Sequence, residues 1–210
     1  MISIDKIDEG LPVSVIIPLS KKREKFFYEY VLPMIEMNEP KEIIINKNPG
    51  SAPKKRNEGF KKSTQPYVFF CDDDILLPKN ILEKFLCVLE KDKNVGYTYC
   101  SYDGIVLNPQ THPMRGNFKI ISKPFNADEL KIRNYISTMS LMRRDVFFGF
   151  DEKLERFQDW SLYLYMLEKG IVGKFVENTG FFAFYMDEGI TSNNNNINQA
   201  YNIIKTKHGL

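Results

Sequence analysis

Residues 67–78 read YVFFCDDDILLP, an apolar run that meets three consecutive aspartates and then a second apolar segment ending in proline. Apolar residues fill every position of 67–71, which is typical of a strand that is buried on both faces of a parallel sheet. The aspartates 72–74 follow at the carboxyl end of this strand, where open α/β sheets bind their ligands. The stretch therefore predicts both a fold class and the position of a site.

Apolar runs of the same kind alternate with helical patterns through the first half of the chain. Strands are expected over 13–17, 42–45 and 95–100, and helices over 22–36, 52–62 and 78–89. This alternation predicts an α/β protein with a mostly parallel central sheet and helices on both faces.

The second half is less regular. Turn signals fill 103–127, and the elements expected after them are a strand within 136–142, a helix over 159–167 ended by Gly170, an aromatic strand over 181–185 and a closing helix over 197–207. The asparagine-rich residues 186–196 are expected to form either a closing lid or a plain surface loop. No repeat or linker divides the chain, so residues 1–210 are expected to form one domain.

The composition excludes several classes of protein. The 210 residues carry 29 basic and 27 acidic side chains, and this near balance gives no basis for a nucleic-acid binder. No apolar run approaches the roughly 20 residues of a membrane span, and no signal peptide is recognisable. The three cysteines lack the spacing of a disulfide framework or a metal site, so we interpret them as core residues in a reducing compartment. A cytoplasmic location is therefore expected.

The aspartates after the third strand are the first candidates for a site. Alternate residues of an extended chain point to the same side, so Asp72 and Asp74 are expected to face one spot while Asp73 faces away. Two carboxylates in that position suit Mg²⁺ or Mn²⁺. The alternative is a solvated acidic turn that caps the helix beginning near Pro78.

Four motifs stand in the order of a known family. They are VSVIIP at 13–18, KRNEG at 55–59, the aspartates followed by LP at 77–78, and GFDE at 149–152 followed by QDW at 158–160. With these motifs the chain resembles family 2 of the inverting glycosyltransferases over about residues 12–190. The resemblance implies a GT-A-like, Rossmann-type sandwich. Its nucleotide-binding half would cover about 12–103, its acceptor-side half about 104–190, and a C-terminal loop and helix 191–210.

The resemblance also implies a function. It is the metal-dependent transfer of a sugar from a nucleotide-diphosphate sugar, preferably a UDP-sugar, to the hydroxyl of a glycan or lipid-linked acceptor. The transfer would proceed with inversion and serve the synthesis of a glycan or polysaccharide. The alternative is a catalytically degenerate domain that binds a nucleotide or glycan without turnover.

Two other enzyme classes fit less well. A sugar nucleotidyltransferase is disfavoured because residues 19–23 lack the glycines of a phosphate-binding loop. A phosphatase of the haloacid-dehalogenase type is disfavoured because no threonine closely follows the aspartates. The glycosyltransferase interpretation therefore leads.

By the same resemblance, individual residues receive roles. Asp159 is the candidate base that takes the proton of the acceptor hydroxyl, although its position alone suggests a first-turn helix acid. Asp72 and Asp74 would hold Mn²⁺ or Mg²⁺. Trp160 and Asp187 are candidates on the acceptor side, and Trp160 is equally well interpreted as a core aromatic. The residues expected to bind the nucleotide sugar are Pro18, Asn46, Asn48, Arg56, Asn57, Asp72 and Asp73.

The chain departs from the family at three places. Asn46 and Asn48 stand where the family has an acidic residue that reads the nucleotide base. Gln158 stands where the family has a glutamate. No histidine follows the last strand, where the family often has a metal ligand, so Asp187, Glu188 or water is left to fill that position.

A basic cluster lies at the start of the helix expected over 22–36. Lys21, Lys22, Arg23 and Lys25 stand beside three aromatic residues. The cluster is open to two interpretations. One is peripheral contact with an anionic membrane or a lipid-linked acceptor, and the other is a solvated helix face with its aromatic residues in the core.

Overall fold

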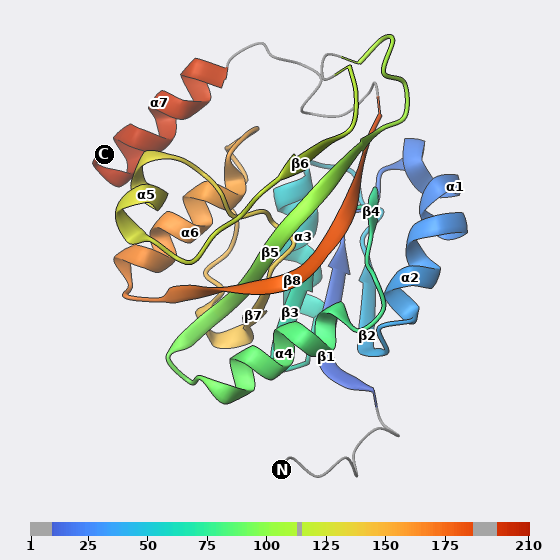
Figure 1. The fold of residues 1–210 in the computed structure, drawn as a ribbon, viewed down its shortest axis with the longest axis horizontal. Helices are drawn as coiled ribbons and strands as arrows, with labels where there is room; N and C mark the ends of the chain where they lie inside the picture. Colours follow the sequence, from blue (N-terminus) through green and yellow to red (C-terminus); the bar gives the residue numbers. More distant parts are fainter. Residues whose placement is uncertain (1–9, 113–114, 187–196) are drawn as a thin grey trace.

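The computed structural model describes residues 10–112, 115–186 and 197–210. Within these ranges one eight-stranded sheet runs through the molecule (Figure 1). Its strands in chain order are β1 (Leu11–Ile17), β2 (Pro40–Ile45), β3 (Tyr67–Phe70), β4 (Ile75–Leu76), β5 (Val95–Val106), β6 (Phe118–Ile120), β7 (Leu141–Arg143) and β8 (Val172–Tyr185). In space the order is β2-β1-β3-β7-β5-β8-β4, and β6 pairs with β5 outside this row.

Most strands of the sheet point the same way. β1 is parallel to β2 and β3, and β5 is parallel to β8. β7 lies between β3 and β5 and is antiparallel to both, so β5 keeps the direction of β3. The short strands β4 and β6 add antiparallel pairs. The predicted α/β class with a mostly parallel sheet is confirmed, and the alternation in the sequence did not predict the insertion of β7.

Helical segments cover both faces of the sheet, as predicted. They are α1 (Glu24–Phe26), a π-helical turn (Phe27–Val31), α2 (Leu32–Glu36), α3 (Ala52–Lys62), α4 (Ile81–Lys91), α5 (Ala127–Ile132), α6 (Gln158–Glu168) and α7 (Ile197–His208), with 3₁₀ turns at Lys21–Arg23 and Arg144–Val146. Val13, Val15 and Ile17 of β1 belong to one core cluster with α2 and α4. Ile16 belongs to the other cluster, with α5, α6 and α7. Burial on both faces explains why these strands are apolar at nearly every position.

Several elements differ from their expected bounds. β8 spans 14 residues rather than 181–185 alone, because its first half pairs with β5 although it carries polar side chains. The strand expected within 136–142 is the shorter β7. The helix expected from Pro78 begins at Ile81, after Asn80 adopts a left-handed conformation with φ 67°.

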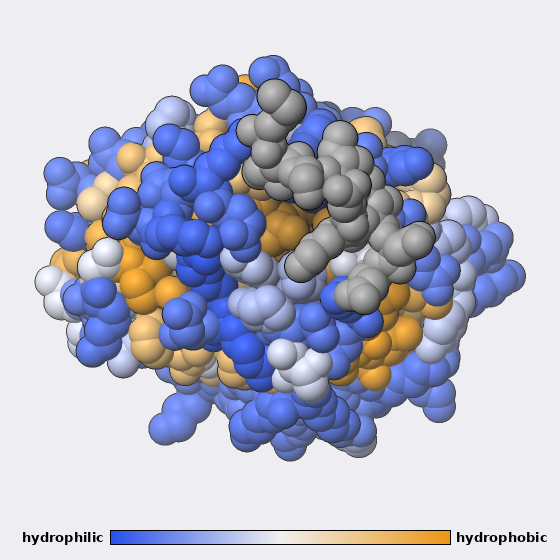
Figure 2. Space-filling model, turned by 90° about the horizontal axis from the view of Figure 1, so that it is seen from below, coloured by the Kyte–Doolittle hydropathy of each residue, from blue (hydrophilic) through white to orange (hydrophobic). Residues whose placement is uncertain are grey.

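The surface of the molecule does not indicate a particular partner. In the described part of the chain, no helix combines the length and the apolar character needed to cross a membrane. The face shown in Figure 2 is mostly hydrophilic, with separate apolar patches. Scattered apolar residues are ordinary on a protein surface and do not identify a partner.

A glycine sets how closely α3 approaches the sheet. A Cβ atom added at Gly59 would lie 2.4 Å from Cγ2 of Ile16 on β1, and 3.7 Å from Cγ2 of Ile44 on β2. The 2.4 Å contact with Ile16 is too short, so the helix or the strand would have to move. The absence of a side chain at this position therefore lets α3 lie against β1 and β2.

Gly59→Ala is expected to destabilise the chain by about 1–3 kcal/mol, the usual cost of overpacking a close-packed contact. Alanine favours a helix over glycine by about 1 kcal/mol, so a net loss reports the clash and not the helix propensity. Urea unfolding of Gly59→Ala and of Gly116→Ala, where an added Cβ meets nothing within 4 Å, measures the difference. Equal midpoints for the two variants would show that α3 is free to shift.

Candidate functional site

A cleft of about 1020 Å³ opens at the carboxyl ends of β1 and β3. Its walls come from both halves of the chain, since α3 and the turn after β3 face the start of α6 and the end of β8. Six residues predicted to belong to the site line it, namely Pro18, Arg56, Asp72, Asp73, Asp74 and Asp159. The fold thus brings these residues together in one cavity.

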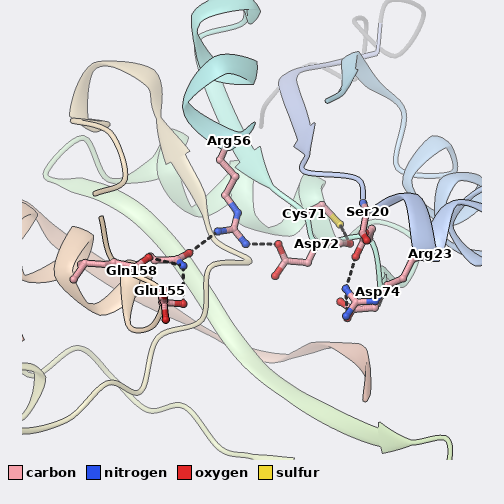
Figure 3. A network of polar contacts seen from close by, with 10 residues as sticks. Ser20, Arg23, Arg56, Cys71, Asp72, Asp74, Glu155 and Gln158 are labelled. Carbon is pink, nitrogen blue, oxygen red and sulfur yellow. Dashed lines mark hydrogen bonds and ion pairs between the residues drawn. The ribbon is translucent and has the colours of Figure 1, made fainter. Parts of the chain in front are cut away.

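Each of the three aspartates is held by a different set of partners (Figure 3). Asp72 accepts a hydrogen bond from the Arg56 guanidinium. Asp73 is 3% exposed and accepts from the backbone N–H of Ser20 at 2.7 Å and from Arg23 Nη1 at 2.7 Å. Asp74 Oδ2 lies 3.1 Å from the same Arg23 nitrogen.

This arrangement corrects one prediction about the aspartates. Asp72 and Asp74 do not share a partner, and Asp73 does not face away from the others. The extended strand ends at Phe70, and the chain turns at Asp73 and Asp74 before β4. The alternation of side chains along a strand therefore does not hold for these residues. Asp73 and Asp74 are the pair that contact one side chain, the guanidinium of Arg23.

Arg56 connects the two walls of the cleft. It lies on α3, its Nη2 donates to Asp72, and its Nη1 donates to Oε1 of Gln158 at 3.1 Å (Figure 3). The guanidinium also lies over the Phe150 ring, 5.2 Å from its centroid. The side chain is only 6% exposed, so Arg56 does not belong to a solvated basic helix face.

One donor of Arg56 is left without a partner. Its Nε is buried and makes no hydrogen bond to any described residue. A buried donor without an acceptor costs free energy and requires an explanation. An anionic group that reached this nitrogen, such as a phosphate, would supply the missing acceptor.

The pKa of Asp74 is raised to about 7. Burial is the main cause, and the neighbouring charges of Asp72 and Asp73 add to it, whereas Arg23 opposes the shift. Arg23 thus only partly compensates the negative charge of this turn. A further cation would favour the ionised form of Asp74.

The carboxylates of the turn suit a divalent cation whose coordination is completed by a bound ligand. Carboxylate oxygens are the hard donors that Mg²⁺ and Mn²⁺ prefer. Among residues 10–112, 115–186 and 197–210, no three carboxylate, histidine or cysteine side chains converge on one point. A cation held by one or two of these carboxylates would need substrate phosphates or water as its other ligands, which is usual for Mg²⁺.

Asp159 lies on the other wall, at the second position of α6. It accepts a hydrogen bond from the backbone N–H of Trp160 at 2.8 Å. The residue before the helix, Phe157, has no polar side chain and is left-handed, with φ 57°. Burial raises the pKa of Asp159, while the Trp160 N–H and Arg56 oppose the shift. Both the base and the helix-start interpretations are compatible with this placement.

Three predicted nucleotide-binding residues do not line the cleft and bond to other residues of the chain. Asn46, 5% exposed, donates to the carbonyl of Lys55 and to Glu58, and accepts from the backbone N–H of Asn48. The Asn48 amide also donates to Glu58. Asn57 is not among the lining residues. Its side chain bonds both backbone groups of Phe150, at 2.8 and 2.9 Å, and so joins α3 to the GFDE segment.

The structure also corrects the acceptor-side candidates. Trp160 is 1% exposed, its indole N–H donates to the carbonyl of Leu130, and its ring packs on Tyr201 of α7 at 5.3 Å between centroids. It is a core residue and not a wall for an acceptor. Asp187, Glu188 and the candidate lid, apart from Met186, lie outside the described residues.

Sequence reasoning missed several residues of the cleft. Arg23, His112, Tyr102 and Tyr185 line it as well. His112 comes from the turn after β5, is 2% exposed, and has its ring 5.9 Å from that of Tyr185. His112 is distant from Asp159 in sequence, but the long β5 carries it back to the same cavity. No local motif marks His112, so only the topology reveals it.

Comparisons with known proteins identify the family and the fold of the chain. The model of the family described as "Glycosyl transferase family 2" matches residues 14–148. No curated protein matches the sequence significantly. Among solved structures, the S. aureus TarS 1–349 fragment in complex with UDP-GlcNAc is 14% identical, with a TM-score of 0.71 over 94% of this chain and 66% of that one.

Two other TarS structures give the same result. The 1–349 fragment in complex with UDP is 12% identical and has a TM-score of 0.65, over 94% of this chain and 65% of that one. A further TarS chain is 15% identical, with a TM-score of 0.61 over 94% and 39%. This chain thus spans less than two thirds of the TarS chains. The likeness confirms the GT-A-like fold expected from the motifs.

Asp159→Asn is expected to stabilise the folded chain at pH 8. Asparagine can still accept from the Trp160 N–H but carries no charge, so an ionised buried carboxylate is removed. Because the pKa of Asp159 is raised on folding, this carboxyl contributes less to stability as the pH rises from about 3.8, its ordinary value, through the folded pKa. The gain in urea midpoint should therefore be larger at pH 8 than at pH 4.

Asp128→Asn is the matched control. Asp128 holds the same second position in α5, but its side chain is 92% exposed. Its removal should lower stability slightly at pH 8, since a first-turn carboxylate favours a helix by about 0.3–1 kcal/mol. A loss of stability in Asp159→Asn at both pH values would instead identify Asp159 as a structural helix acid.

Proposed function

Because this chain belongs to glycosyl transferase family 2, we propose that it transfers a sugar from a nucleotide-diphosphate sugar to an acceptor hydroxyl. The single observation that carries the proposal is the cleft itself, in which Arg56 joins the Asp72 turn of the donor half to the start of α6. Its buried Nε has no partner among the described residues, and an anionic donor that reached this atom would supply an acceptor. Positively charged, planar guanidinium groups are well suited to binding diphosphates.

The donor we propose is a UDP-sugar. The TarS 1–349 fragment was solved in complexes with UDP-GlcNAc and with UDP, which supports this choice by fold likeness only. The side-chain amide of Asn46 donates to Glu58 and to the carbonyl of Lys55 and accepts from the backbone N–H of Asn48. The side-chain amide of Asn48 donates to Glu58. Recognition of the base would therefore rely on other groups near Pro18 and Lys55, which line the cleft.

Although Asp72 and Asp74 contact different arginines in this structure, we propose that both carboxylates hold one divalent cation, Mn²⁺ or Mg²⁺, when the donor is bound. When bound, such a cation supplies positive charge to the departing nucleotide diphosphate. Asp73 is anchored by Ser20 and Arg23 and fixes the conformation of the turn that carries the other two. Asp74, with its raised pKa, gains most from the added positive charge.

Asp159 is the residue we propose as the general base. Direct displacement at the anomeric carbon requires the acceptor oxygen to lose its proton as it attacks, and a carboxylate on the far wall from the diphosphate can accept it. Attack from that side inverts the anomeric centre. The raised pKa brings Asp159 closer to neutral pH, which makes it a stronger base than an ordinary aspartate.

A second candidate function is binding without turnover. One observation favours it, because Asp72 and Asp74 both contact arginines and neither is left without a positive partner. In that case, the domain would recognise a nucleotide or glycan and leave the glycosidic bond intact. Release of free sugar from UDP-GlcNAc in the presence of Mn²⁺ separates the two functions.

The acceptor and the location are proposed more broadly. A glycan or lipid-linked hydroxyl is the acceptor class that the family suggests. The three cysteines are all unpaired, which supports a reducing compartment such as the cytoplasm.

Asp74→Asn is expected to abolish the effect of metal on nucleotide binding. In the wild type, Mn²⁺ should raise the affinity for UDP by about 5–150-fold, the usual range of coupling between two ligands. Calorimetric titration of UDP with and without Mn²⁺ measures this factor. It should fall to about one in Asp74→Asn and stay unchanged in Asp103→Asn, which removes an exposed carboxylate of β5. Equal UDP affinities with and without metal in the wild type would contradict the cation site.

Asp159→Asn is expected to reduce sugar transfer by about 10²–10⁴-fold, the usual contribution of a general base. The affinities for UDP and Mn²⁺ should hardly change, because the base contacts the acceptor and not the nucleotide. Where no acceptor is known, hydrolysis of UDP-GlcNAc to free sugar serves as the assay, since water needs the same base. Near-normal turnover in this variant would exclude Asp159 as the base.

A further inference from the structure

The basic cluster at the start of the first helical segment is not a uniform solvated face. Lys21 and Lys22 are exposed, but Arg23 turns into the cleft. Its Nη1 lies 2.7 Å from Oδ1 of Asp73 and 3.1 Å from Oδ2 of Asp74 (Figure 3). Neither of the two interpretations open from the sequence describes this residue.

A single nitrogen of Arg23 thus bridges carboxylates from two adjacent residues. The second oxygen of Asp73 is fixed by the Ser20 N–H at 2.7 Å, and the backbone carbonyl of Asp74 accepts from Phe184 on β8 at 2.9 Å. The carboxylates therefore stand on a fixed turn. The side chain of Arg23 is longer than those of the aspartates, and 20% of it is exposed, so it can reorient more easily than the carboxylates can.

Arg23 and a divalent cation compete for the same oxygen atoms. A cation bound through Oδ2 of Asp74 takes the oxygen that Arg23 now contacts, and a cation at either oxygen of this carboxylate would stand next to the positive charge of the guanidinium. An arginine side chain stays protonated in proteins. Deprotonation therefore does not relieve the competition, and the guanidinium must move.

We propose that Arg23 keeps the cation site closed until the donor's diphosphate enters the cleft. The diphosphate offers Arg23 a second anionic partner, and when the guanidinium transfers to it, Asp74 becomes available to the cation. Nucleotide and metal then bind together, and free metal alone binds poorly. The inference rests on the proposed function, since it takes Asp74 as a cation ligand.

The proposal has a thermodynamic consequence. If UDP strengthens Mn²⁺ binding by a given factor, Mn²⁺ strengthens UDP binding by the same factor. Part of this factor comes from displacing Arg23. Removal of the guanidinium should therefore strengthen the binding of Mn²⁺ alone and weaken the coupling to UDP.

Titration of Mn²⁺ into the full chain, followed by electron paramagnetic resonance of the free ion, tests this directly. Arg23→Gln should bind Mn²⁺ alone at least tenfold more tightly than the wild type, and the enhancement by UDP should shrink correspondingly. Lys21→Gln is the matched control, because it removes one charge from the same turn at an exposed position outside the cleft. It should leave both quantities unchanged.

Arg23→Lys is a second variant, for the case that Arg23→Gln does not fold. Lysine keeps the charge but lacks the fork of the guanidinium, so this variant should bind Mn²⁺ alone with intermediate affinity. Far-UV circular dichroism and thermal melts establish that each variant is folded.

The results separate failure of the inference from failure of the proposed function. If the wild type binds Mn²⁺ with UDP but Arg23→Gln and Arg23→Lys bind Mn²⁺ alone no more tightly than the wild type, the role of Arg23 is overturned and the cation site stands. An equal gain in Lys21→Gln also overturns it, since general charge then explains the effect. If the wild type binds no Mn²⁺ even with UDP, both the cation site and the inference fail.

Discussion

The ion pair and hydrogen bond made by the Arg56 guanidinium are the interactions on which the site depends. Arg56 joins Asp72 to Gln158, and Gln158 lies 102 positions after Arg56 in the chain. Asp72 and Gln158 bond the same buried guanidinium, so the position of α3 links the turn after β3 to the first turn of α6. Gly59, one helical turn away, allows α3 to lie close enough to the sheet for this. The packing of one helix thus determines how the two walls of the cleft face each other.

The family motifs contain two kinds of residue, and the structure separates them. Asp72, Asp74 and Arg56 face the cleft, where a ligand can reach them. Asn57 and Trp160 stand beside functional residues in sequence but bond the backbone of Phe150 and Leu130. A side chain next to a catalytic candidate is often the one that fixes its backbone. Proximity within a motif therefore does not identify a ligand contact.

The local pattern of apolar residues predicts most of the fold. The features that it does not predict depend on how the strands pair. The apolar runs predicted β1, β3 and the start of β5, since burial on both faces leaves a continuous signal in the sequence. They did not predict that β7 inserts between β3 and β5, nor that β8 begins at Val172, because pairing partners leave no local trace. The orientation of Asp73 and the arrival of His112 depend on a turn and on a distant strand. For the same reason, Arg23 could be assigned to the cleft only from the structure.

The packing of Trp160 between Leu130 and Tyr201 has a consequence for the order in which the site forms during synthesis. Translation proceeds from the amino terminus, and the β1–β3 half can begin to fold while later residues are still being added. Asp159 acquires its final surroundings only after Tyr201 has left the ribosome, because α7 covers the indole that immediately follows the carboxylate. A nascent chain that has reached the end of β8 would therefore have the strands β1–β3 available for folding and Asp159 still without the support of α7. The surroundings of Asp159 are thus among the last parts of the cleft to be completed during synthesis.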